Sequence, residues 1–114
     1  MPRNMSFMLT TDQIRNRTKF VTRRLGWWFL KPGDILNACE KCMGLKKGEK
    51  VKKICQLRVV SVKKEILDET ITEDEIIKEG FPHLTTARFL YMFCKEMGCN
   101  PGVEVNRIEF EYLS

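Results

Sequence analysis

The longest alternation of hydrophobic and polar residues covers residues 51–62 and predicts a β-strand. Leu57 and Val59 fall on one face of this strand, whereas Val60 and Val62 fall on the opposite face. Because side chains alternate strictly along a regular strand, this switch of parity indicates a β-bulge between Val59 and Val60. A bulge bends a strand, as the closing of a small barrel requires.

Further segments have the character of strands. The Lys-Pro-Gly-Asp motif at residues 31–34 predicts a turn that leads into a strand over residues 35–39. Hydrophobic and acidic residues alternate over residues 103–112, which predicts a closing strand. The β-branched residues within 19–25 indicate an extended segment, and residues 1–8 form either a flexible arm or a first strand.

Capping residues predict where helices begin and end in the rest of the chain. A threonine at position 10 or 11 can cap a brief helix through residues 12–14. Thr72 and Glu75 form a capping box whose short helix ends near Gly80. A further helix begins at residue 85 or 86 and stops at Gly98. Its apolar face comprises Phe89, Leu90, Phe93, Cys94 and Met97.

The order of these elements predicts an α+β fold, a small and mostly antiparallel β-barrel with two or three short helices. The chain has 114 residues, which suits a single domain over residues 1–114.

No stretch approaches the roughly 20 apolar residues of a membrane span, so we expect no membrane partner. Residues 1–11 lack the pattern of a signal peptide, and five cysteines, an odd number, favour the reducing cytoplasm.

The net charge of +5 conceals a strong asymmetry between two parts of the chain. Residues 1–64 contain 16 Lys and Arg against 4 Asp and Glu, whereas residues 65–114 contain 4 against 11. The basic part could bind a polyanion, most simply nucleic acid. Alternatively, the two parts pack together and neutralise each other.

A basic segment over residues 15–24 contains five of these cations and carries a resemblance to a known family. Its Lys-x-x-Thr-x-Arg motif is formed by Lys19, Thr22 and Arg24, and the 31–34 turn follows it. With Glu-Gly-Phe at 79–81 and the closing strand, the chain resembles the ASCH domain from about residue 9 to 113, and most closely the small free-standing ASCH proteins of bacteria and prophages.

The resemblance implies a PUA-like barrel with a cleft that receives RNA or a nucleotide. One branch of small bacterial ASCH proteins consists of amidohydrolases that deacetylate N4-acetylcytidine. The catalytic Lys, Thr and Glu of that branch match Lys19, Thr22 and Glu79. We expect first an RNA- or nucleotide-binding protein with a basic cleft that recognises single-stranded RNA or a modified nucleoside, with Lys19 and Arg24 in contact with phosphate. The alternatives are an amidohydrolase that deacetylates N4-acetylcytidine through Lys19, Thr22 and Glu79, and a protein-interaction adaptor.

The chemistry of these three residues suits cleavage of an amide. Thr22 could be the nucleophile, and Lys19 could activate it if burial and the neighbouring Arg23 and Arg24 keep its amine neutral. Glu79 could transfer the proton to the leaving amine. Glu79 belongs to the acidic part of the chain, so the two parts would have to meet at the site.

For nucleic-acid binding we expect phosphate contacts from cations and stacking from one tryptophan. Two consecutive tryptophans on an extended backbone point to opposite faces, so one could enter the core and the other face the cleft. Lysines of the loop over residues 44–48 could follow a nucleic-acid backbone. The candidate binding residues are Arg15, Arg17, Lys19, Arg23, Arg24, Trp27, Trp28, Lys46 and Lys47.

Metal and cofactor sites have little support. Cys39 and Cys42 form a CxxC motif, a weak zinc pattern that Cys94 and Cys99 could complete. Buried or incidental thiols are the alternative. The single histidine, His83, cannot form a histidine-based cluster, and no glycine-rich phosphate loop is present, so we expect no cofactor.

Overall fold

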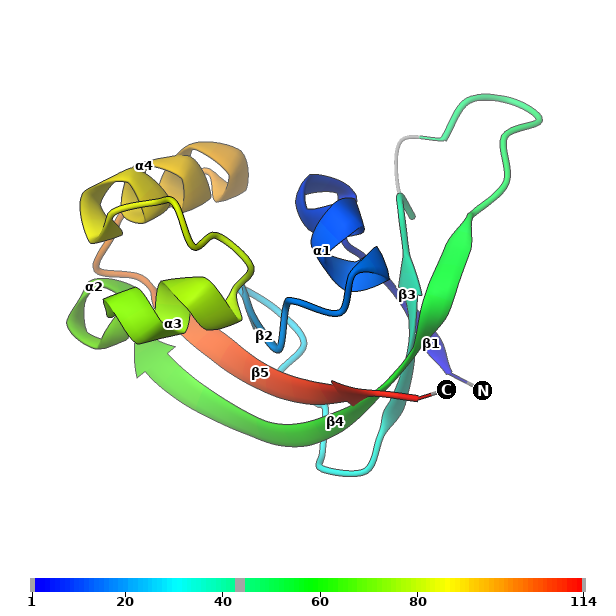
Figure 1. Cartoon of the computed structure of the whole chain (residues 1–114), viewed down its shortest axis with the longest axis horizontal. Coiled ribbons are helices and arrows are strands. Elements are labelled where there is room, and N and C mark those ends of the chain that lie inside the picture. The colour runs from blue at the N-terminus through cyan, green and yellow to red at the C-terminus, as the bar shows by residue number, and fades with distance from the viewer. Residues whose placement is uncertain (1, 43–44, 114) are drawn as a thin grey trace.

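The computed structural model describes residues 2–42 and 45–113, which form one curled sheet flanked by helices (Figure 1). The strands are β1 (Arg3–Ser6), β2 (Val21–Arg24), β3 (Ile35–Cys39), β4 (Lys53–Ile66) and β5 (Glu104–Tyr112). The helices are the 3-10 helix η1 (Met8–Thr10), α1 (Thr11–Arg15), α2 (Leu67–Thr70), α3 (Glu73–Lys78) and α4 (Thr86–Met97).

The strand order in the sheet is β1-β3-β4-β5-β2. β1 pairs with β3 in parallel, whereas the other three pairings are antiparallel. The 14-residue β4 pairs with β3 through its first part and with β5 along most of its length. The sheet therefore curls into a half-barrel, which confirms the predicted α+β, mostly antiparallel fold.

The predicted bulge is present where the parity of β4 changes. The register between β4 and β5 shifts between Val59, which pairs with Phe110, and Ser61, which pairs with Glu109. Bulges bend the strand that carries them, so this one lets a single long strand serve two parts of the molecule. In Figure 1, β4 sweeps from beside β3 to the base of α2.

Two hydrophobic clusters fill the molecule, one at each end of β4 and β5. The first, the sheet core, contains Met5, Phe7, Ile14, Leu30, Leu36, Ala38, Leu57, Val59, Ile108 and Phe110. The second, the helix core, contains Leu67, Ile76, Phe89, Phe93 and Val105. Because β5 contributes Val105 to one cluster and Ile108 to the other, the strand ties the two together.

The helix ends agree largely with the predicted caps. The Oγ atoms of Thr72 and Thr85 accept bonds from backbone N–H groups three residues later, both at 3.2 Å, and Gly98 ends α4 in the left-handed conformation. Thr10 occupies the N-cap position of α1, but its side chain makes no capping bond. The four-residue α2 is a helix that the pattern did not predict.

The N-terminal segment is the first strand of the sheet, not a flexible arm. Arg3–Ser6 pair with residues 36–39 of β3, and Met5 is fully buried. Met1 and Gly44, which belong to the predicted arm and to the predicted lysine loop, lie outside the described residues. Within the described ranges, no helix has the length and apolar character needed to cross a membrane.

Candidate functional site

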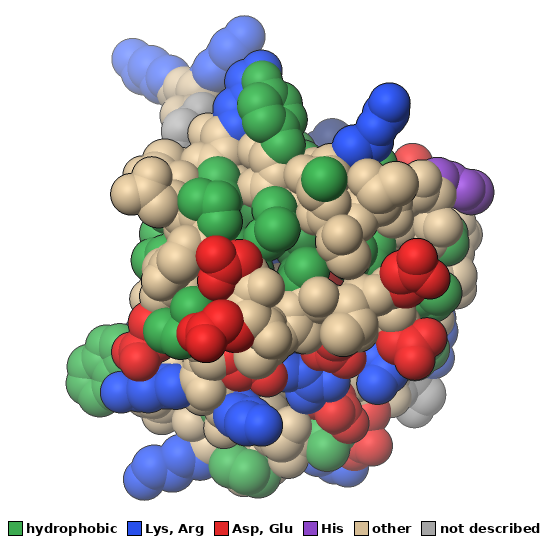
Figure 2. Space-filling model, turned by 90° about the vertical axis from the view of Figure 1, so that its left-hand side faces the viewer, with side chains coloured by type: hydrophobic (Ala, Val, Ile, Leu, Met, Phe, Trp, Pro, Cys, Tyr) green, Lys and Arg blue, Asp and Glu red, His purple; other side chains and the backbone are tan. Residues whose placement is uncertain are grey.

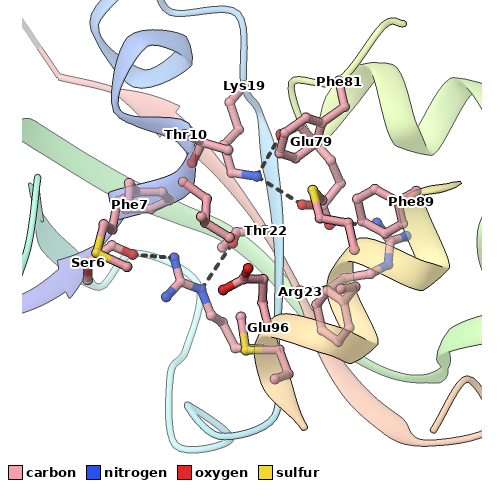
Figure 3. A pocket seen from close by; sticks show the side chains of 16 residues that line it. Ser6, Phe7, Thr10, Lys19, Thr22, Arg23, Glu79, Phe81, Phe89 and Glu96 are labelled. Carbon is pink, nitrogen blue, oxygen red and sulfur yellow. Dashed lines mark hydrogen bonds and ion pairs between the residues drawn. The ribbon is translucent and has the colours of Figure 1, made fainter. Parts of the chain in front are cut away.

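A pocket of about 220 Å³ lies between the N-terminal segment, β2 and α4 (Figure 3). Aromatic and methionine side chains form much of its wall, including Phe7, Phe81, Phe89, Met92 and Phe93. Its polar lining residues are Ser6, Thr10, Lys19, Thr22, Arg23, Arg24, Glu79 and Glu96. All three residues predicted to be catalytic line this pocket, although Lys19 and Glu79 are 60 positions apart in the sequence.

Lys19 and Glu79 form a buried ion pair at the base of the pocket. The Lys19 Nζ lies 2.9 Å from Glu79 Oε1 and also donates to the Glu79 backbone carbonyl at 2.7 Å. Their side chains are 3% and 4% exposed, so water hardly reaches the pair. Burial lowers the pKa of Lys19, with Arg24 and Arg23 acting in the same direction and Glu79 opposing them.

Local backbone contacts place these two residues opposite each other. Lys19 precedes β2, and its carbonyl oxygen accepts a bond from the Tyr112 hydroxyl at 2.5 Å. Glu79 caps the C-terminal end of α3, where Gly80 turns the chain with a φ of +98°. A Cβ at position 80 would lie 2.9 Å from Gln13 Cγ, so glycine permits the close approach of α3 to α1.

Thr22 and Arg24 lie on the strand beside this pair. The Arg24 Nε donates to Thr22 Oγ1 at 3.0 Å, and Arg24 Nη2 donates to the Ser6 carbonyl at 2.7 Å. Thr22 is 3% exposed, and with its oxygen accepting from Arg24 its hydroxyl proton can be donated elsewhere. Burial lowers the pKa of Arg24 to about 10.

Arg23 is buried in a network of carboxylates, which we call the Arg23 network and define as Arg23, Glu65, Glu75, Glu79 and Arg107. The fully buried guanidinium bonds to Glu79 Oε2 at 3.0 Å, to Glu65 at 3.4 Å and also to Glu75. Arg107 Nε bonds to Glu75 at 2.6 Å, and these bonds with Arg107 and Arg23 lower the pKa of Glu75 to about 2. The Arg23 guanidinium is thus already paired with carboxylates, and its predicted role in binding nucleic acid stays a prediction.

The basic and acidic parts of the chain thus meet at the pocket. Lys19 and Arg23 come from the basic part, and Glu79 with the other carboxylates of the Arg23 network comes from the acidic part. This is the mutual neutralisation that the charge asymmetry left open as an alternative. Figure 2, which views the side of α2, α3 and α4, shows acidic side chains across the middle of this face and Lys and Arg toward its upper edge and in its lower part.

The other candidate cations lie outside the pocket. Arg15 forms an ion pair with Glu40, and the Arg17 guanidinium lies 5.4 Å from the centre of the Tyr112 ring. Lys46 and Lys47 belong to the segment between β3 and β4, which Figure 1 shows on the opposite side of α1 from α4. A role for these four residues in binding nucleic acid stays a prediction.

The two tryptophans do not have the predicted extended backbone. Trp27 has a φ of +68° in a turn between β2 and β3, and its side chain packs against the sheet core. Trp28 is 72% exposed, and its ring packs edge-on against Phe29. One tryptophan is therefore packed and one exposed, as predicted, but neither lines the pocket.

The cysteines do not assemble a metal site in the described part of the chain, where no three His, Cys, Asp or Glu side chains gather around a common point. Cys94 and Cys99 pack against the helix core, whereas Cys39 is buried at the end of β3. Burial, together with the neighbouring Cys42, raises the pKa of Cys39 to about 11, which is the behaviour of a protonated thiol. His83 lies exposed before α4.

The sequence interpretation missed three polar lining residues, Ser6, Thr10 and Glu96. We expected no site in the segment of Ser6 and Thr10, because nothing in its pattern indicates that Arg24 of β2 reaches the Ser6 carbonyl. Glu96 follows Phe93 by three positions and Phe89 by seven, so it shares their face of α4. The helical period could therefore have identified Glu96.

The arrangement can perform two kinds of chemistry. Aromatic walls with hydrogen-bonding groups at one end suit a flat, polar ring system. A buried amine with a lowered pKa beside a hydroxyl and a carboxylate also suits proton transfer and nucleophilic attack.

Comparisons with known proteins give structural relatives only. No protein-family model matches the sequence, and no curated protein matches it significantly. The ASCH domain from Lactobacillus crispatus JV V101 superposes with a TM-score of 0.61 at 17% identity, over 96% of this chain and 78% of that one. Protein EF3133 from Enterococcus faecalis V583, described under the family DUF984, superposes with a TM-score of 0.69 at 13% identity, over 99% of this chain and 80% of that one.

The hypothetical protein PH0355 superposes with a TM-score of 0.68 at 18% identity, over 99% of this chain and its whole length. Identities this low support a shared fold, not a shared activity. The predicted assignment to the wider PUA-like group stays a prediction. The chain has the fold of the ASCH domain.

Proposed function

We propose that the protein binds a nucleoside, or a single base of single-stranded RNA, in the Lys19 pocket. The observation that carries the proposal is the convergence of Lys19, Thr22 and Glu79 at one end of a pocket walled by aromatic side chains. Small-molecule sites have this composition, in which apolar walls supply affinity and a few placed polar groups fix orientation.

The size of the pocket supports a single base as the ligand. At about 220 Å³, it is smaller than the roughly 300 to 1,000 Å³ of typical drug-binding sites. Phe81 and Phe89 lie on one side, and their rings could pack against a base. Lys19, Thr22 and Glu79 together supply donors and acceptors for the edge of the base.

Calorimetric titration with the four common ribonucleosides tests the proposal. Thr22→Val keeps the shape of the side chain and removes its hydroxyl, so we expect nucleoside binding to weaken by about tenfold or more. Arg58→Met removes an exposed cation outside the pocket and serves as the control, with unchanged binding expected. Equal binding by wild type and Thr22→Val would place the ligand elsewhere, and no binding of any nucleoside would reject the proposal.

The RNA form of the proposal has its own readout. If exposed cations such as Arg15, Lys46 and Lys47 follow a single strand, affinity for an oligonucleotide should fall with salt by about 0.7 in log–log slope for each phosphate contact. A triple variant that replaces these three residues with glutamine should reduce that slope and leave nucleoside binding intact. An oligonucleotide that binds no better than a nucleoside would restrict the ligand to free nucleosides.

A second candidate function, hydrolysis of an N-acylated nucleoside, is favoured by the burial and lowered pKa of Lys19. If the proton of the buried pair resides on Glu79, the Lys19 amine is neutral and can take the Thr22 proton as Oγ1 attacks the amide carbonyl. The C–N bond then breaks, and the amine leaves with a proton delivered through Lys19 and Glu79. Water hydrolyses the resulting ester, which restores Thr22 and releases the carboxylic acid.

Incubation with N4-acetylcytidine, followed by detection of cytidine and acetate, tests this candidate. Wild type should release both products, whereas Lys19→Ala and Thr22→Val should release neither. Thr22→Val is the decisive variant because it removes no buried charge, and circular dichroism verifies that each protein is folded. Failure of wild type to release cytidine would reject hydrolysis of this substrate and leave the binding proposal intact.

We also propose a cytoplasmic location, where nucleosides and RNA are abundant and cysteine thiols stay reduced. Fractionation of cells that express the protein, followed by immunodetection, tests this location.

A further inference from the structure

Glu96 is a charged residue of the pocket that the proposed function does not use. It lies on the last turn of α4, its side chain is exposed, and it lines the pocket. Figure 3 shows its carboxylate directed toward the space between Thr22 and α4. Among the residues that the structure describes, Glu96 has no ion-pair partner, unlike Glu79 at the base of the pocket.

The exposed lining residues mark the mouth of the pocket. Met8 is 59% exposed, Leu9 is 48% exposed and Met97 is 38% exposed, whereas Lys19 and Glu79 are almost completely buried. Glu96 therefore belongs to a mouth that otherwise consists of apolar side chains. A base that reaches Lys19 would leave its ribose, and any phosphate on that ribose, near this mouth.

Two of the three cations that line the pocket are already paired with carboxylates and attract a phosphate less than free cations would. Lys19 is paired with Glu79, and Arg23 is surrounded by the carboxylates of the Arg23 network. Arg24 has no carboxylate partner in the described residues, and two of its three nitrogens, Nε and Nη2, already donate to Thr22 and to the Ser6 carbonyl. A neutral acceptor such as the carbonyl of a base fits there.

We propose that Glu96 selects uncharged ligands, so that the pocket binds nucleosides in preference to nucleoside phosphates. The carboxylate repels a phosphate dianion at the mouth and accepts a hydrogen bond from a ribose hydroxyl or an amino group. The proposal rests on the proposed function and narrows its ligand class. In RNA, a base would enter while its flanking phosphates stay outside the mouth.

Paired titrations with each ribonucleoside and its 5′-monophosphate test the selection. Wild type should bind the nucleoside about tenfold more tightly or better, and the ratio should shrink at high salt because the carboxylate is exposed. Glu96→Gln should reduce the ratio, and Glu96→Lys should reverse it. Glu104→Lys, an equal charge change at an exposed position outside the pocket, should leave the ratio unchanged.

The outcomes separate this inference from the function on which it rests. Binding of nucleosides and monophosphates with equal affinity, or an unchanged ratio in Glu96→Lys, would overturn the role of Glu96 and leave the pocket as a nucleoside site. Tighter binding of monophosphates by wild type would overturn it too and assign Arg24 to phosphate. Failure to bind any nucleoside or monophosphate would overturn both proposals.

Discussion

Replacement of Arg23 by methionine should destabilise the protein strongly, although Arg23 belongs to the basic segment of residues 15–24. Its guanidinium is fully buried and bonds to Glu65, Glu75 and Glu79. Methionine fills much of the same volume but leaves three carboxylates without this cation. Loss of one partner from a buried ion network costs about 3–5 kcal/mol. For a chain of this size, that corresponds to a fall in Tm of roughly 10 to 20 °C.

Arg58→Met is the matched control for this experiment. Arg58 pairs with Glu111 at 2.9 Å, a distance close to that between Arg23 and Glu79, but both members of this pair are about half exposed. Exposed pairs contribute about 1 kcal/mol or less because water and salt screen them. Urea and thermal unfolding at pH 7 measure both variants. Equal losses for Arg23→Met and Arg58→Met would refute the argument from burial.

Acid should narrow the difference between wild type and Arg23→Met. The pKa of Glu75 is lowered from 4.5 to about 2 in the folded protein, so its stabilising contribution is present above pH 4.5 and is lost as the pH falls toward 2. In Arg23→Met, protonation of Glu65, Glu75 and Glu79, which have lost the Arg23 cation, relieves the repulsion among these carboxylates. The gap in unfolding free energy should therefore be largest near neutral pH and smaller near pH 3. A gap that widens toward pH 3 would contradict the assigned charges.

Three further perturbations test other parts of the structure. Gly80→Ala should lower the unfolding free energy by about 1–3 kcal/mol, because φ is +98° and the new Cβ would contact Gln13. In the control Gly26→Ala, the new Cβ would have no atom within 4 Å. Equal denaturation midpoints for the two variants would contradict this prediction. Thr72→Ala removes the N-cap of α3 and should cost about 1 kcal/mol in urea unfolding, an effect that Thr72→Ser should largely spare. Because the pKa of Lys19 is lowered in the folded protein, the unfolded chain binds the Lys19 proton more tightly, and wild-type stability should rise with pH between the folded pKa and about 10.5. Lys19→Met should flatten this rise in denaturation curves measured from pH 7 to 10.

The elements that could be predicted well from the sequence are those specified by residues close together in the chain. The bulge in β4 follows from a change of parity at Val59, and the starts of α3 and α4 follow from Thr72 and Thr85. Each of these features depends on residues within a few positions of one another. The four-residue α2 was missed because so short a helix has too few positions to show a period.

The site could be predicted in its composition but not in its electrostatics. The motif resemblance identified Lys19, Thr22 and Glu79, and all three line one pocket. In contrast, Arg23 belongs to a run of cations that is typical of a solvated surface, and its burial depends on carboxylates more than 40 positions away. Trp27 was misjudged for a related reason, because its positive φ depends on the turn that encloses it.

The position of β2 in the sheet has a consequence for how the protein is made. β2 lies at one edge of the described sheet, and its neighbour there is β5, the last strand in the described chain. A ribosome therefore releases Lys19, Thr22 and Arg24 long before the strand that holds them in place. Closing so long a loop is slow relative to local helix formation, so the pocket should be among the last features to mature. Until then, the cations of residues 15–24 are exposed in the nascent chain, and a polyanion such as RNA could bind them before the carboxylates of the Arg23 network pair with Arg23.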